Sequence, residues 1–175
     1  MNCNSILIVD DEEMVRLMIK EMLKDKAGKV ISVESGSQAL KILSRNRFDI
    51  ILTDVNMPDM NGFQLIEYAK LIDPMIPIIV MTGYSDVYDL REAMAKGAEE
   101  YILKPFKQED LKSAIDRVLL RSIVKRNEFM LKYVSIANSL ISHSNEPNKD
   151  ELIIIGRRLV KYIESPVTYP DQPNV

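Results

Sequence analysis

The sequence is poor in the residues on which several kinds of functional site depend. Its 175 residues include one cysteine, Cys3, one histidine, His143, and no tryptophan. A single cysteine excludes an internal disulfide and a zinc site built from thiolates. A single histidine argues against histidine-rich metal chemistry and against a Ser-His-Asp triad. The search therefore narrows to sites that need neither thiolates nor a set of histidines.

The chain also lacks an excess of positive charge and any long hydrophobic run. Lysine and arginine total 23 against 26 aspartates and glutamates, which gives a net charge of −3. A nucleic-acid-binding protein needs a dense basic surface, so we expect no direct DNA binding by this chain. No stretch approaches the ~18 apolar residues needed to cross a bilayer, and the first residues lack the basic start of a signal peptide. We expect no membrane contact and a cytoplasmic location.

What the sequence does contain is a regular alternation of short β-branched runs and amphipathic segments. Helices are predicted after each run; the first is predicted to end near Gly28, and Ser35 or Ser37 is predicted to cap the second. Because the runs are almost continuously apolar, they predict an α/β fold with a doubly wound, five-stranded parallel sheet and helices on both faces. The predicted strands cover residues 6–9, 30–33, 48–55, 76–81 and 101–103.

Polar side chains gather at the carboxyl ends of these predicted strands. The carboxyl ends of parallel strands lie at one edge of a sheet, which is where open α/β sheets bind their ligands. Taken singly, each residue has an ordinary explanation, such as an acidic first helical turn, a turn residue or a surface lysine. Their shared position at strand ends favours a common site. The residues are Asp10, Asp11, Asp54, Thr82 and Lys104.

The chemistry of this cluster points to phosphoryl transfer. Three neighbouring carboxylates repel one another unless a cation lies among them, and oxygen-only ligands in a hydrated site favour Mg²⁺. Lys104 adds a fixed positive charge and Thr82 a hydroxyl, which suit the oxygens of a phosphoryl group in transfer. Asp54 ends the strand that topology makes central. It is therefore the predicted nucleophile, with Asp10 and Asp11 holding the metal.

Four motifs at these positions resemble the receiver domain of bacterial two-component response regulators, the CheY-like family. The resemblance covers roughly residues 3–126, and it implies the strand order 2-1-3-4-5. The motifs are Ile8-Val9-Asp10-Asp11-Glu12, Leu52 to Pro58 with Gly62, Met81-Thr82-Gly83, and Leu103-Lys104-Pro105-Phe106.

The resemblance assigns roles to the acidic residues. It implies that Asp54 accepts a phosphoryl group from a phosphohistidine of a sensor histidine kinase or of a histidine phosphotransfer protein. Mg²⁺ would be held by Asp54, by Asp11 directly, by Asp10 mostly through water and by the backbone carbonyl of Asn56. The catalysis would be limited to self-phosphorylation and autodephosphorylation, so we expect no metabolic enzyme.

The resemblance also implies a switch. Thr82 and Lys104 would contact phosphoryl oxygens, and the peptide bond between Lys104 and the following proline would be cis. Tyr101 would turn inward as Thr82 is drawn to the phosphate, which changes the surface of the fourth helix, fifth strand and fifth helix. Asn56 and Tyr84 occupy the two positions that tune phosphate lifetime.

The last third of the chain predicts an extended helical segment. No glycine or proline interrupts residues 106–146, so we predict one helix over residues 108–142. We assign residues 1–126 to the receiver, 127–164 to a helical extension that includes a second short helix, and 165–175 to a proline-rich tail or linker. A seam with coiled-coil-like spacing, which Arg126 weakens, comprises Leu119, Ile123, Arg126, Met130, Tyr133, Ala137 and Leu140. The apolar face of the second short helix needs cover, either from the long helix in a hairpin or from a second subunit.

Four functions are compatible with these features. We favour a receiver whose phosphorylation controls homodimerisation through the C-terminal helices or docking of a partner. The alternatives are a phosphorelay shuttle without an output of its own, or the N-terminal fragment of a longer regulator. An aspartyl-phosphate phosphohydrolase ranks last, because it needs a second aspartate two residues after the nucleophile, where the chain has Asn56.

Overall fold

The computed structural model describes residues 3–83, 87–143, 154 and 156. Its five strands form one parallel sheet in the order β2-β1-β3-β4-β5, which confirms the predicted fold class and order. The chain divides between Ser122 and Ile123 into two compact units, and the sheet belongs to the first. The strands are β1 (Cys3–Val9), β2 (Ala27–Val33), β3 (Ile50–Asp54), β4 (Ile78–Thr82) and β5 (Glu100–Leu103).

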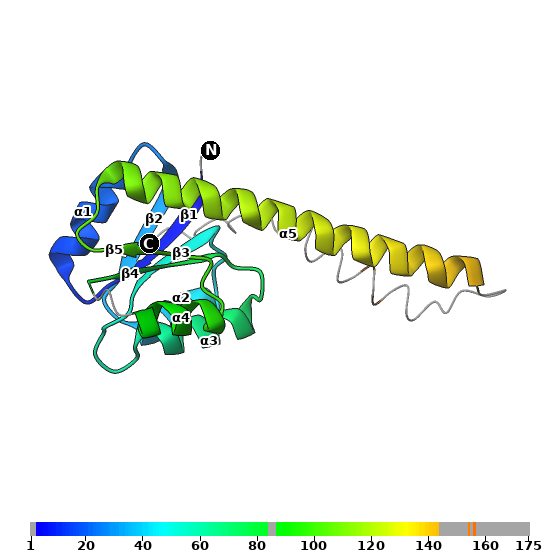
Figure 1. The fold of residues 1–175 in the computed structure, drawn as a ribbon, viewed down its shortest axis with the longest axis horizontal. Coiled ribbons are helices and arrows are strands. Elements are labelled where there is room, and N and C mark those ends of the chain that lie inside the picture. The colour runs from blue at the N-terminus through cyan, green and yellow to red at the C-terminus, as the bar shows by residue number, and fades with distance from the viewer. Residues whose placement is uncertain (1–2, 84–86, 144–153, 155, 157–175) are drawn as a thin grey trace, which may run out of the picture. The chain divides into compact units, whose positions relative to one another are not determined.

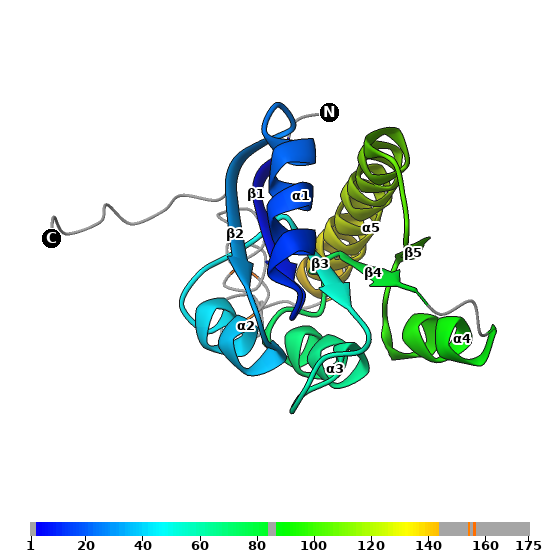
Figure 2. The same cartoon turned by 90° about the vertical axis from the view of Figure 1, so that its left-hand side faces the viewer.

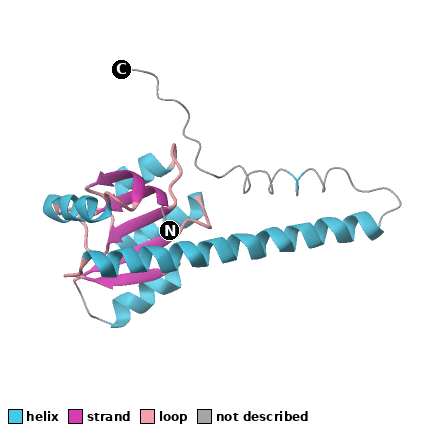
Figure 3. Cartoon of the chain, turned by 90° about the horizontal axis from the view of Figure 1, so that it is seen from above, coloured by secondary structure: helices cyan, strands magenta, loops and turns pink. Residues whose placement is uncertain are grey.

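Helices cover both faces of the sheet, as expected for right-handed crossovers. Side chains alternate along each strand, so Ile6 and Ile8 of β1 pack in one core cluster while Leu7 and Val9 pack in the other. One cluster joins the sheet to α1 and α5, and the other joins it to α2, α3 and α4 (Figure 2; the strands appear in magenta in Figure 3). The helices are α1 (Glu13–Leu23), α2 (Gly36–Leu43), α3 (Gly62–Ile72), α4 (Val87–Lys96) and α5 (Gln108–His143), labelled in Figure 1.

The prediction that the first helix ends near Gly28 is wrong. Helix α1 ends at Leu23, and Gly28 lies inside β2, which starts at Ala27. The reason is long-range pairing: Cys3 of β1 is in register with Ala27, so the ladder extends three residues beyond the predicted strand start. Local spacing cannot reveal this pairing, because the β1 partner precedes β2 by more than twenty residues.

The cap of α2 is Ser35, whose side chain accepts a hydrogen bond from the backbone N–H of Gln38 at 3.3 Å.

The sheet is most deeply buried at its centre. Every residue of β3 and β4 is buried, whereas the edge strands β2 and β5 carry partly exposed residues. Strand β3 lies between β1 and β4, so Asp54 ends the central strand, as topology predicts. This burial matters for the site, because a carboxyl group at the end of a buried strand is held among low-dielectric walls.

Helix α5 runs for 36 residues and matches the predicted helix to within one residue at its end. The predicted tail lies outside the described residues, as does the second short helix except for residues 154 and 156, which are helical. Among the helices that the structure describes, none combines the length and apolar character that a membrane crossing requires.

Candidate functional site

The ammonium group of Lys104 joins two carboxylates at the carboxyl edge of the sheet. Lys104 Nζ lies 2.7 Å from Asp10 Oδ2 and 2.7 Å from Asp54 Oδ1. Asp10 follows β1, Asp54 ends β3 and Lys104 follows β5, so parallel topology brings together residues that are far apart in the sequence. The exposed fractions of the side chains are 0% for Asp10, 9% for Asp54 and 18% for Lys104. The result is a nearly buried, charge-paired centre in which Asp54 and Lys104 keep a small exposed area.

The remaining carboxylate oxygens are held by backbone donors. Asp10 Oδ1 accepts from the backbone N–H of Glu12 at 3.0 Å, and Asp54 Oδ2 accepts from that of Asn56 at 2.7 Å. Each carboxylate therefore has one ammonium and one amide partner. Two donors on different oxygens fix the plane of a carboxyl group, so both groups are oriented before any ligand binds.

The loop after Asp54 is folded tightly by a glycine. The N–H of Gly62 donates to the carbonyl of Val55 at 2.9 Å, which closes the segment between β3 and α3. A Cβ atom at position 62 would meet the Asp54 carbonyl oxygen and would lie 2.9 Å from Val55 Cα. Asn61 and Gln64 then form a capping box at the start of α3. Only glycine fits this approach, so Gly62 helps to place Asp54.

The ionisation of the centre is set by burial and by mutual charge. Burial raises the pKa of Asp54 above its ordinary value of 3.8, and Lys104 and the N–H of Asn56 oppose this rise without cancelling it. Burial by itself would lower the pKa of Lys104, but its hydrogen bonds and charge pairing with Asp10 and Asp54 raise it above 10.5. At neutral pH the lysine is therefore charged, and it screens the repulsion between the two carboxylates.

The other predicted site residues lie around this centre but do not all converge on it. Thr82 is buried at the end of β4, the strand next to Asp54, whereas Asp11 and Asn56 are exposed. Tyr101 is 42% exposed on β5, so its ring points outward in this structure. Tyr84 lies outside the described residues. The peptide bond between Lys104 and Pro105 is cis, as the resemblance implied.

The donor set fits a hard cation such as Mg²⁺. The carboxylates of Asp10 and Asp54 approach the same ammonium group, and carboxylate oxygens are the ligands that a hard cation prefers. In the described part of the chain, however, no group of three or more Asp, Glu, His or Cys side chains is already placed to hold a metal ion. The exposed Asp11 carboxylate would have to join Asp10 and Asp54 to complete such a set.

Sequence reasoning missed Arg16. Its guanidinium group donates to the carbonyl oxygens of both Asp10 and Asp11. The one available signal was an arginine a single turn into the helix that follows the two aspartates, and such a position has many ordinary explanations.

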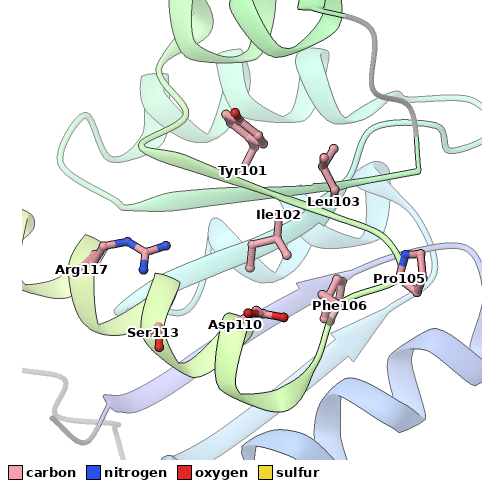
Figure 4. Close-up of a pocket in the computed structure, with 8 residues that line it drawn as sticks. All are labelled: Tyr101, Ile102, Leu103, Pro105, Phe106, Asp110, Ser113 and Arg117. Carbon is pink, nitrogen blue, oxygen red and sulfur yellow. The ribbon is translucent and has the colours of Figure 1, made fainter.

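A separate pocket of about 450 Å³ lies between β5 and the first three turns of α5 (Figure 4). Its apolar surface includes Ile102 and Phe106, and Asp110 and Arg117 add charges of opposite sign. It contains none of the residues of the charge-paired centre. Tyr101 and Leu103 project from one face of β5, and Ile102 projects from the other face, toward α5 (Figure 4).

Comparison with known proteins shows a family likeness. A family model of the response regulator receiver domain matches residues 6–116. The sporulation initiation phosphotransferase F of Bacillus subtilis is 32% identical over 114 residues, which are 65% of this chain and 92% of that protein. The transcriptional regulatory protein ZraR of Escherichia coli is 33% identical over 114 residues, 65% of this chain but only 26% of that protein.

Solved structures show the same likeness. The chemotaxis protein CheY4 of Vibrio cholerae superposes with a TM-score of 0.63 at 32% identity, over 66% of this chain and 98% of that chain. A CheY-like receiver domain protein of Methanospirillum hungatei gives a TM-score of 0.66 at 29% identity, over 70% and 98% of the two chains. Both structures therefore match about two thirds of this chain and nearly the whole of their own chains.

Proposed function

Because this chain belongs to the response regulator receiver domain family, we propose that it is the phosphoacceptor of a two-component or phosphorelay pathway, with Asp54 as the accepting residue. The observation that carries this proposal is the contact of Lys104 Nζ with both Asp54 and Asp10 at 2.7 Å. It supplies a nearly buried carboxylate with a fixed cation beside it. Receiver domains are signalling domains rather than metabolic enzymes, and the proposed chemistry is confined to Asp54.

The proposed reaction is the transfer of one phosphoryl group to a carboxylate. An Asp54 oxygen attacks the phosphorus of a phosphohistidine on a sensor kinase or a histidine phosphotransfer protein. The P–N bond breaks, its electrons return to the imidazole, and a P–O bond completes an acyl phosphate. Lys104 and the Thr82 hydroxyl would bind the oxygens of the transferred group. Hydrolysis of the acyl phosphate by water would return Asp54 to its free form.

The group expected beside Asp54 is Mg²⁺. Asp10, Asp11, Asp54 and the carbonyl of Asn56 would hold it. When bound, it would neutralise charge that develops on the phosphoryl oxygens. Lys104 keeps Asp10 and Asp54 oriented, so this chain's own residues prepare the ligands. Asn56 and Tyr84 would set the lifetime of the acyl phosphate.

The proposed output begins with Thr82 and Tyr101. Movement of Thr82 toward the phosphoryl group would open space for the exposed Tyr101 ring to turn inward. That turn would reshape the surface made by α4, β5 and α5, including the pocket beside Ile102. The response could then be read by a docking partner or by a second copy of the chain. We expect a cytoplasmic protein that does not itself contact DNA.

Homodimerisation would use the part of α5 after Ser122. Several large apolar side chains of this segment are exposed. Ile123 belongs to the predicted seam, and the others lie beside it. Leu131 is 70% exposed, whereas the neighbouring seam residue Met130 is half-buried. The exposed set in this segment is Ile123, Val124, Leu131, Val134 and Ile136.

A phosphorelay shuttle is the second candidate, and one observation favours it. The matched part of the chain spans 92% of a relative named as a phosphotransferase. By contrast, it spans only 24% of the response regulator protein FleR of Pseudomonas aeruginosa and 26% of ZraR. A shuttle would pass its phosphoryl group from Asp54 to a histidine of another protein. The third alternative, a piece of a longer regulator, follows from the same partial coverage of FleR and ZraR.

The acceptor is tested by incubating the chain with Mg²⁺ and acetyl phosphate and measuring the intact mass. We expect the mass of one phosphoryl group on the wild type and none on Asp54→Asn, with Asp25→Asn as a control at an exposed aspartate. Phosphorylation of Asp54→Asn to the wild-type level would contradict the proposal. Rapid turnover of a generic phosphate ester would instead favour the phosphohydrolase.

A further inference from the structure

One side chain holds the backbone of the two aspartates that follow β1. Arg16 lies in the first turns of α1, and its Nη1 atom donates to the Asp10 carbonyl at 2.7 Å and to the Asp11 carbonyl at 3.0 Å. The backbone N–H of Arg16 donates to the Glu12 carbonyl at 3.1 Å, so the residue is also anchored in the helix. A single nitrogen thus clamps two consecutive peptide groups where the chain leaves the sheet.

The two aspartates differ in what else holds them. The Asp10 carboxylate is fixed by Lys104 and by the N–H of Glu12. The Asp11 carboxylate is exposed, and none of the described residues donates a hydrogen bond to it. The direction of the Asp11 side chain therefore depends on its own backbone. The clamp from Arg16 is the contact that restrains that backbone at its carbonyl.

From this geometry we infer that Arg16 is a positioning residue for a divalent-cation site, acting through the peptide group of Asp11. The inference rests on the proposed function, because it takes Asp11 to be a ligand of the cation. Groups that orient metal ligands without touching the metal commonly account for a tenfold or larger part of the affinity. Arg16 would supply this orientation from a backbone contact.

The positive charge of Arg16 and its restraint of the Asp11 backbone predict opposite effects on cation affinity, so the inference can be tested. The guanidinium group is positive, so by charge alone its removal would tighten the binding of a divalent cation. If Arg16 acts by holding Asp11, its removal would weaken binding, because a freely moving ligand must be ordered when the cation binds. The sign of the change in affinity therefore separates the two roles.

The experiment measures Mn²⁺ binding by the loss of the free-ion electron paramagnetic resonance signal, which requires no phosphoryl transfer. We expect Arg16→Met to bind about tenfold more weakly than the wild type. Lys20→Met, which removes the same charge from the last turn of the same helix, should bind within about twofold of the wild type, because any charge effect is screened. Arg16→Lys keeps the charge, but its ammonium group reaches less far than the guanidinium group, so its affinity should be intermediate. It also provides the measurement if Arg16→Met does not fold.

A double-mutant cycle with Asp11→Asn tests the route of the effect. If Arg16 acts through Asp11, substitution of Arg16 should change Mn²⁺ affinity less than twofold in the Asp11→Asn background. Unchanged or tighter binding by the Arg16 variants in the wild-type background would overturn the inference. An equal loss in both backgrounds would overturn it as well. Absence of Mn²⁺ binding by the wild type would reject the metal site of the proposed function, and the role of Arg16 with it.

Discussion

In the centre around Asp54 the charged groups find partners within the chain, whereas α5 beyond Ser122 leaves large apolar side chains on its surface. Lys104 pairs with Asp10 and Asp54, and backbone amides occupy the remaining oxygens of both carboxylates. In the later part of α5, residues such as Leu131 and Val124 are exposed. The first region has its geometry fixed by the fold, and the second has apolar surface that a partner would cover. The difference suggests that the chemistry resides in the first region and the choice of partner in the second.

The largest effect is expected when the cation of the centre is removed. Lys104→Ala should lower the rate of phosphorylation by acetyl phosphate about 10²- to 10³-fold, because a preoriented positive group no longer meets the phosphoryl oxygens. Intact mass measured over time gives the rate. Lys107→Ala, three residues later and exposed, is the matched control. A rate for Lys104→Ala close to that of Lys107→Ala would place the reactive centre elsewhere.

A smaller effect is expected at the loop that supports Asp54. Gly62→Ala should lower the free energy of unfolding by about 2–3 kcal/mol, because the added Cβ meets the Asp54 carbonyl oxygen and Val55. Gly83→Ala should change it by less than about 0.5 kcal/mol, since nothing lies within 4 Å of a Cβ atom there. Chemical denaturation of both variants checks the prediction. Equal stability of the two would show that the loop can relax.

Substitutions in the later part of α5 should change the affinity of the homodimer and leave the rate of phosphorylation unchanged. Leu131→Glu should weaken any homodimer by about 2 kcal/mol, the contribution typical of a buried leucine side chain. The same variant should be phosphorylated at the wild-type rate. Sedimentation equilibrium measures the association, and Ser135→Glu controls for the added charge at an exposed position of the same helix. If Met130→Glu disrupts the dimer and Leu131→Glu does not, the predicted seam rather than the exposed residues forms the contact.

The smallest effect concerns the cost of keeping Asp54 ionised. Since the pKa of Asp54 is raised in the folded protein, the folded state holds this proton more tightly than the unfolded state. Wild-type stability should therefore fall as the pH rises from 3.8 through the raised pKa, and Asp54→Asn should be more stable at neutral pH by about 1 kcal/mol. Urea denaturation at neutral and acid pH checks the difference, which should shrink in acid. A wild type that is more stable than Asp54→Asn at neutral pH would contradict this sign.

Periodicity and topology were enough to predict most of the fold and the core of the site. The apolar strands predicted the sheet, and strand ends predicted that Asp10, Asp54 and Lys104 would meet. The absence of glycine and proline predicted the length of α5. These features are local or follow from the parallel arrangement of strands, so a sequence can carry them.

The missed features depend on contacts between distant segments or between side chains and backbone. Pairing with β1 draws Gly28 into β2, which the helical spacing before it does not reveal. Arg16 was missed because it contacts two backbone carbonyl groups. Every residue has a backbone carbonyl, so the sequence carries no signal for such a contact.

Coupling between the Asp54 centre and α5 is tested most directly by light scattering with Mg²⁺, with and without beryllofluoride, on the wild type and Asp54→Asn. Beryllofluoride mimics a phosphoryl group on a carboxylate, so it reports on the acceptor without a kinase. We predict that the mass doubles in the wild type on addition of beryllofluoride and does not change in Asp54→Asn. A wild-type mass that beryllofluoride leaves unchanged, or the same doubling in Asp54→Asn, would contradict control of association by Asp54.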